Sequence, residues 1–191
     1  IMRRWTVMGI VSFFLLLAIS PLGAREKEEA ILEGRAFVPF ITSENQVKER
    51  FFSRASITVI DLHTGRVVAE GETGMDGSYE IPVPPRRSYL VQFQKDNQII
   101  LDICERVKKG ERYNLSFANA RSTAMSLVLL HLFSGKKDPN IIITYKANRI
   151  LQAESFPLLQ QKVSEAIARG KNPEDDSEIR LLIDHIALSV Q

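Results

Sequence analysis

The sequence predicts an α+β protein in which a β-sandwich of two antiparallel sheets comes first and a helical region follows. Residues 32–117 alternate apolar and polar side chains with a period of two, interrupted at short intervals by turn residues. From residue 122 onward, apolar residues recur at helical spacing instead. Seven short strands at this spacing are typical of two packed antiparallel sheets.

The first 24 residues have the features of a secretory signal peptide. Arg3 and Arg4 precede an apolar run, Val7–Ile19, and small residues that suit a signal peptidase follow it. The run is short for a membrane span, which needs about 20 apolar residues. We therefore expect cleavage and a periplasmic or extracellular protein. The alternative is an inner-membrane anchor formed by residues 5–22, and only in that case do we expect a membrane partner.

Seven strands are expected in the first part of the chain, at residues 32–38, 55–60, 67–73, 78–81, 89–94, 99–103 and 113–117. Gly65 supplies the positive φ that the turn after the second strand requires. The Asp76-Gly77 pair is a strong hairpin signal between the third and fourth strands. Residues 41–54 are polar in their middle, and we expect a loop there.

Three to four short helices are expected after the sandwich, at residues 122–133, 138–151, 155–170 and 172–190. Gly170 is expected to stop the third helix. The predicted organisation is thus a signal peptide at 1–24, a sandwich domain at 25–118 and a helical region at 119–191 that packs on the sandwich.

Composition and charge narrow the classes of partner. Hydrophobic residues make up 45% of the chain and charged residues 25%, as in ordinary globular proteins. Without Arg3 and Arg4, 23 basic residues stand against 23 acidic ones, whereas nucleic-acid binding normally requires clustered Lys and Arg. We expect no nucleic-acid partner. Cys104 is the only cysteine, which excludes an internal disulfide, and we expect it to be buried on a strand.

A resemblance to a known family rests on four segments, Glu33–Arg35, Ala55–Val59, Thr73–Tyr79 and Tyr89–Val91. They are similar to the carboxypeptidase regulatory-like domains, small transthyretin-like β-sandwiches appended to exported and envelope proteins. The chain departs from the family pattern at Gly74, where an acidic or amide residue is usual. The resemblance implies the fold and a bacterial exported protein of unassigned role. It implies no activity, because the family has no single chemistry.

The sequence contains no recognisable catalytic or metal-binding motif. His63, His131 and His185 lie far apart without metal-ligand spacing, and we expect His131 to be a core residue of an apolar helix. Neither a serine-hydrolase elbow nor a phosphate-binding loop occurs. We therefore expect no catalytic residue, no metal and no cofactor.

These observations favour a non-catalytic binding module of the cell envelope that contacts another envelope protein. The contact would use an exposed sheet edge, by strand addition, or an aromatic patch in the segment 37–52 made by Phe40, Phe51 and Phe52. The alternative for these phenylalanines is burial as core.

Two other functions stay open at the level of sequence. A carbohydrate-binding accessory protein would need exposed aromatic rings, whereas Tyr79, Tyr89 and Tyr113 fall on inward faces. A hydrolase would need a site whose residues are dispersed along the chain and therefore escape the spacing rules.

Overall fold

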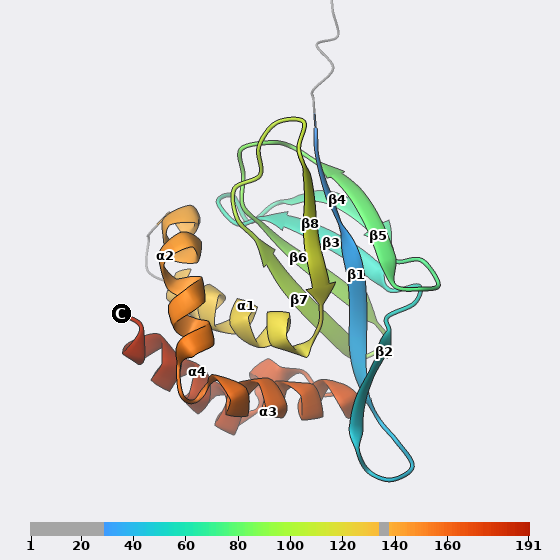
Figure 1. Cartoon of the computed structure of the whole chain (residues 1–191), viewed down its shortest axis with the longest axis vertical. Helices are drawn as coiled ribbons and strands as arrows, with labels where there is room; N and C mark the ends of the chain where they lie inside the picture. The colour runs from blue at the N-terminus through green and yellow to red at the C-terminus, as the bar shows by residue number, and fades with distance from the viewer. Residues whose placement is uncertain (1–28, 134–137) are drawn as a thin grey trace, which may run out of the picture.

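The structure is a computed structural model that describes residues 29–133 and 138–191, with the strands first and the helices second (Figure 1). The strands are β1 (Ala30–Ile41), β2 (Val47–Phe51), β3 (Ser56–Asp61), β4 (Val67–Glu72), β5 (Ser78–Val83), β6 (Tyr89–Lys95), β7 (Gln98–Cys104) and β8 (Arg112–Ala118). The helices are α1 (Ala120–Phe133), α2 (Pro139–Gln152), α3 (Phe156–Ala168) and α4 (Ser177–Ser189), with a 3-10 turn, η1 (Pro173–Asp175). Among these helices none is long and apolar enough to span a bilayer, and the predicted signal peptide lies outside the described residues.

The α+β prediction is confirmed, and the strands form two sheets. One sheet has the order β4-β3-β6-β7 and is antiparallel throughout. In the other, β1 pairs antiparallel with β2 and β5, and parallel with β8. The parallel pair departs from the expected antiparallel sheets, because the alternation of side chains along a strand carries no information about the direction of its neighbour.

The segment 41–54 was predicted to be a loop, and this was wrong for its second half. Val47–Phe51 forms β2, which pairs with the second half of β1 from Phe37↔Phe51 to Ile41↔Val47. All five residues of β2 are exposed. A strand that is solvated on both faces shows no apolar alternation, which is the signal that sequence analysis relies on.

One apolar core lies between the sheets and continues under the helices. The Tyr79 ring reaches across from β5, with its centroid 4.9 Å from that of Phe93 on β6. Gly34 on β1 makes room for it, since a Cβ at this position would lie 2.9 Å from the Tyr79 hydroxyl. Tyr89 is also fully buried, and Tyr113 is half-buried.

Helix α1 covers the outer edge of β7. The Ser122 hydroxyl donates to the Leu101 carbonyl (2.7 Å), and the Thr123 hydroxyl accepts from the Leu101 N–H (3.0 Å). Asn119 caps the helix, accepting from the N–H groups of Arg121 and Ser122. Backbone groups of an edge strand that would otherwise face solvent are thereby bonded.

The remaining helix boundaries follow from their caps. Asp138 caps α2 as its position before Pro139 predicts, and Gly170, with φ +67°, follows the end of α3. The last helix begins later than predicted: Asn172 caps only η1, and Asp176 caps α4. The apolar stripes of α3 and α4 are buried, as expected, at Phe156, Leu159, Val163, Ala166, Ile167, Ile179, Ile183 and Ile186.

Replacing Gly77 with alanine should destabilise the sandwich strongly. Gly77 has φ +73°, and a Cβ there would lie 2.5 Å from the Ala36 carbonyl oxygen of β1. Gly65 also has a positive φ (+67°), but nothing lies within 4 Å of its Cβ position. We expect Gly65→Ala to cost about 1 kcal/mol from backbone strain alone. Gly77→Ala should cost at least about 2 kcal/mol more, measured by urea denaturation; equal costs would contradict the contact.

Candidate binding surface

Three phenylalanines form an exposed cluster on the outer face of the sheet that contains β1. The Phe37 ring lies between the other two, with centroid distances of 5.3 Å to Phe51 and 5.4 Å to Phe117. Phe51 is 44% exposed and Phe117 is 59% exposed. We call these three residues the aromatic patch. Large exposed apolar groups gathered in this way mark interaction sites more often than scattered ones do.

The patch depends on which face each strand presents. Ala36 and Val38 of β1 are buried, so Phe37 between them faces outward, opposite its partner Phe51 on β2. The alternation of β8 predicts Phe117 on the inner face, but Ser116 has φ +57°. The register between β1 and β8 also shifts at this level of the sheet. This irregularity turns Phe117 to the outer face.

The three predicted binding residues do not share one surface. Phe51 is exposed and belongs to the patch. Phe52, its neighbour in the chain, is 2% exposed and belongs to the core. Phe40 is half-buried on the other side of the hairpin, with the Arg50 guanidinium 5.4 Å from its ring centroid. Phe37 and Phe117 were missed, the latter because its exposure depends on the irregularity of β8.

Charged side chains border the patch on its β1 side. The Arg35 guanidinium lies 5.9 Å from the centroid of Phe51 and forms an ion pair with Asp76 (3.3 Å). Further along, Arg112 of β8 bonds Glu33 of β1 and Glu80 of β5. Arg35, Glu33 and Glu80 line a shallow hollow of about 490 Å³ that Phe117 also borders. The surface therefore offers an apolar centre beside paired charges, an arrangement typical of protein interfaces.

On the β2 side, Glu49 borders the patch at the start of α1. Its carboxylate accepts a hydrogen bond from the Ala120 N–H, and partial burial raises the pKa of this carboxyl above its ordinary value.

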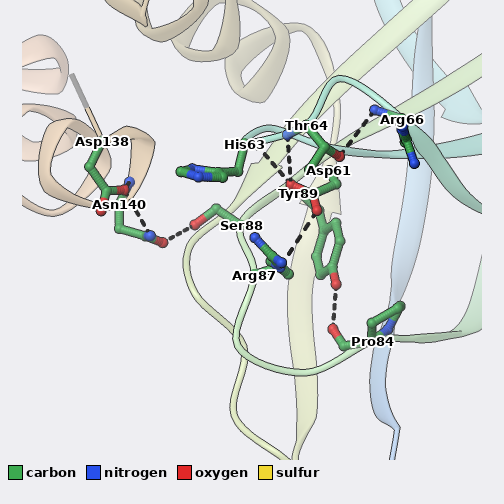
Figure 2. A network of polar contacts seen from close by, with 10 residues as sticks. All are labelled: Asp61, His63, Thr64, Arg66, Pro84, Arg87, Ser88, Tyr89, Asp138 and Asn140. Carbon is green, nitrogen blue, oxygen red and sulfur yellow. Dashed lines mark hydrogen bonds and ion pairs between the residues drawn. The ribbon is translucent and has the colours of Figure 1, made fainter. Parts of the chain in front are cut away.

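A second polar cluster lies at the turn after β3 (Figure 2). The Asp61 carboxylate accepts the backbone N–H groups of His63 (2.7 Å) and Thr64 (3.2 Å) and lies 3.7 Å from the Arg87 guanidinium. Asp61 is only 5% exposed. Its oxygens are therefore engaged in holding the turn, as an aspartate at this position of a turn commonly does.

The same cluster joins the sandwich to α2. The Tyr89 hydroxyl donates to the Pro84 carbonyl, and the Ser88 hydroxyl donates to the Asn140 side-chain oxygen (Figure 2). Asn140 in turn contacts Asp138, the cap of α2. These bonds give the cluster a positioning role between a β-turn and a helix.

Several ionisable side chains are buried in the sandwich, among them Asp102, Cys104 and Tyr79. Burial raises the pKa of the Asp102 carboxyl to about 7, and that of the Cys104 thiol to about 12. Burial also raises the pKa of Tyr79, whose hydroxyl has no hydrogen-bond partner among the described residues. Cys104 is buried on β7 as predicted. A thiol with a raised pKa is a poor nucleophile, because the thiolate is the reactive form.

The histidines do not converge. His131 was predicted to be a core residue, and this was wrong: it is exposed on α1, with its Nε2 3.5 Å from the Asp184 carboxylate of α4. Across residues 29–133 and 138–191, no group of three His, Cys, Asp or Glu side chains could hold a metal ion.

Comparisons with known proteins give no relative that assigns a function. No family model and no curated protein matches the chain. Among solved structures, a 9R-lipoxygenase from Cyanothece PCC8801 has a TM-score of 0.29 at 12% identity, over 64% of this chain and 24% of that one. A type II cohesin–X-dockerin complex from Acetivibrio cellulolyticus has a TM-score of 0.29 at 21% identity, over 46% and 52%. A proposed carbohydrate-binding protein from Bacteroides uniformis has a TM-score of 0.27 at 14% identity, over 47% and 40%.

In each case the match spans about half or less of the other chain. Likenesses this weak carry no argument for either fold or function.

Stability should fall as the pH rises through neutrality, because Asp102 must ionise in the core. A carboxyl whose pKa is raised from 3.8 to about 7 stabilises the fold fully below about pH 4. That contribution is lost as the pH rises to about 7 and above. Between pH 4 and 8 we expect Asp102 to lower the free energy of unfolding of the wild type by roughly 3 to 5 kcal/mol. The Asp102→Asn variant should lack this decrease, as measured by denaturation at each pH. Parallel pH profiles for the two proteins would contradict the prediction.

Proposed function

We propose that the protein is an exported, non-catalytic binding module of the cell envelope, and that it binds another protein through the aromatic patch. The observation that carries the proposal is the exposure of Phe51 and Phe117 around Phe37 on the outer face of the β1 sheet. Aromatic side chains supply most of the binding energy in many protein interfaces, because they bury a large area with few rotatable bonds.

The geometry of the rings favours a protein partner over a sugar. The Phe37 and Phe51 rings are inclined at 42°, and the Phe37 and Phe117 rings at 75°. The patch is therefore an uneven apolar surface without a flat platform on which a sugar ring could stack. Tyr79 and Tyr89, whose hydroxyl groups could bond a sugar beside a stacked ring, are buried.

The compartment and the family are part of the same proposal. The basic and apolar features of residues 1–24 support export, and the tight turn at Gly77 supports the likeness to carboxypeptidase regulatory-like domains. A non-catalytic role is supported by the way the polar side chains are engaged: Asp61 holds a turn, and Cys104 is buried with a raised pKa.

Substituting the exposed rings should weaken partner binding without unfolding the protein. We expect Phe51→Ser with Phe117→Ser to weaken binding at least about tenfold, since each ring is a candidate hot spot. The measurement is quantitative affinity capture from cross-linked envelopes with tagged residues 25–191, comparing each retained protein between wild type and variant. The thermal unfolding midpoint reports folding.

The control is Leu181→Ser with Leu188→Ser, which removes two apolar side chains of α4 that are even more exposed than the two phenylalanines. A partner lost with the phenylalanine variant and kept with the leucine variant supports the proposal. A partner retained equally by all three proteins contradicts it. Retention on polysaccharide that depends on Phe51 and Phe117 would show that the patch binds a glycan, and would contradict a protein partner.

A further inference from the structure

Strand β2 is an edge strand with an unpaired side. Within the described part of the chain it pairs only with β1, and the β1–β2 hairpin extends past the rest of the sheet (Figure 1). Two other strands at sheet edges, β7 and β4, have neighbours. α1 covers β7 through Leu101, and β4 lies against β5, where Gly71 meets the Ile81 side chain.

The hydrogen-bond register determines which backbone groups of β2 are unpaired. Phe52 N–H donates to Ala36 O at one end of the pairing, and Thr42 N–H donates to Gln46 O at the other (both 2.9 Å). Alternate residues between these bonds face β1, namely Lys48 and Arg50. The backbone N–H and C=O groups of the intervening residues, Val47, Glu49 and Phe51, therefore point away from β1. No hydrogen bond to these groups occurs among residues 29–133 and 138–191.

The outward groups adjoin the aromatic patch. Phe51 contributes its ring to the patch and its backbone to the open edge. Glu49 pairs with Pro39 of β1, which lacks an N–H. In this register the backbone groups of Pro39 lie on the side of β1 away from β2. The hairpin therefore loses no hydrogen bond.

Charge argues against a second copy as the occupant of this edge. In a symmetric dimer, a twofold axis would pair two β2 strands antiparallel and place the same face of each strand on the same side of the sheet. Each residue can then lie opposite only a residue from the same face of β2. The central pairing sets Glu49 opposite Glu49, and Lys48 opposite Arg50. Shifting it by one step either way sets Lys48 opposite Lys48, or Arg50 opposite Arg50. Like charges directly opposite destabilise a strand pair.

We propose that β2 accepts an extended segment of the partner protein as an added strand, and that this segment reads apolar–acidic–basic–acidic–apolar. The two acids lie opposite Lys48 and Arg50, the base lies opposite Glu49, and the apolar ends lie opposite Val47 and Phe51. Main-chain bonds supply affinity in strand addition, and the alternating side chains supply specificity. This inference rests on the proposed function and specifies the partner's chemistry at the same surface.

The probe is a fluorescein-labelled, end-capped peptide containing valine–glutamate–lysine–glutamate–valine. Its pattern is symmetric, so it fits β2 in either strand direction. Its counterpart with lysine–glutamate–lysine at the centre reverses the charges. We expect fluorescence anisotropy to show saturable binding of the first peptide to the wild-type protein and binding at least tenfold weaker for the second. Equal binding of both peptides, or no saturable binding of the first up to millimolar protein, overturns the proposal.

Two variants isolate the main chain. Glu49→Pro removes one outward N–H, which β1 does not use, and Glu49→Ala keeps it; both lose the carboxylate and its contact with Ala120. We expect Glu49→Ala to retain the peptide and Glu49→Pro to lose at least tenfold in affinity at an unchanged unfolding midpoint. Equal affinities of the two folded variants overturn strand addition.

The same two variants in the envelope capture separate this inference from the proposed function. A partner lost with the Phe51 and Phe117 substitutions but kept by Glu49→Pro overturns the added strand alone. A partner that every variant retains as well as the wild type does overturns both the aromatic patch and the added strand.

Discussion

The sandwich depends on a single strand, β1, which pairs with three others. Its first half lies between β5 and β8, and its second half pairs with β2. A strand with two neighbours must bury one face and satisfy both edges, which explains its two unusual residues. Gly34 leaves space for the Tyr79 ring in the core, and Pro39 occurs beyond the last residue paired with β8, where its missing N–H breaks no ladder bond. The outer face of the same strand carries Phe37, so the constraint that organises the core also positions the aromatic patch.

The contrast between β7 and β2 connects the fold with binding. Both strands lie at sheet edges, and edge strands invite pairing with other chains. At β7 the chain uses hydroxyl groups of α1 to bond the Leu101 backbone. At β2 no helix in the described part of the chain bonds the outward backbone groups. The alternating charges of Lys48, Glu49 and Arg50 instead disfavour the symmetric self-pairings centred on these residues, while a partner with the opposite pattern would be accepted. An edge that resists its own copy and adjoins exposed phenylalanines is suited to a specific heterologous contact.

Much of the fold was predictable, because strands buried on one face and helices with one apolar stripe leave a periodic signal. β3, β6 and α3 are examples. β2 left no such signal, since both of its faces are solvated. The direction of β8 and the exposure of Phe117 depend on tertiary pairing and on the left-handed backbone at Ser116. Of the three phenylalanines predicted for the candidate surface, only Phe51 belongs to the aromatic patch. Phe51 and Phe52 are indistinguishable by composition, and the register with β1 decides which of them is exposed.

Residue-resolved amide hydrogen exchange, followed by NMR on the isolated protein, tests most directly whether β2 presents an open edge. The N–H groups of Lys48 and Arg50 should exchange slowly, because they bond β1, whereas those of Val47, Glu49 and Phe51 should exchange at rates close to those of an unprotected chain. This alternation supports an edge that is available for an added strand. Uniform protection of all five amides would show that the edge is already occupied and would contradict the account.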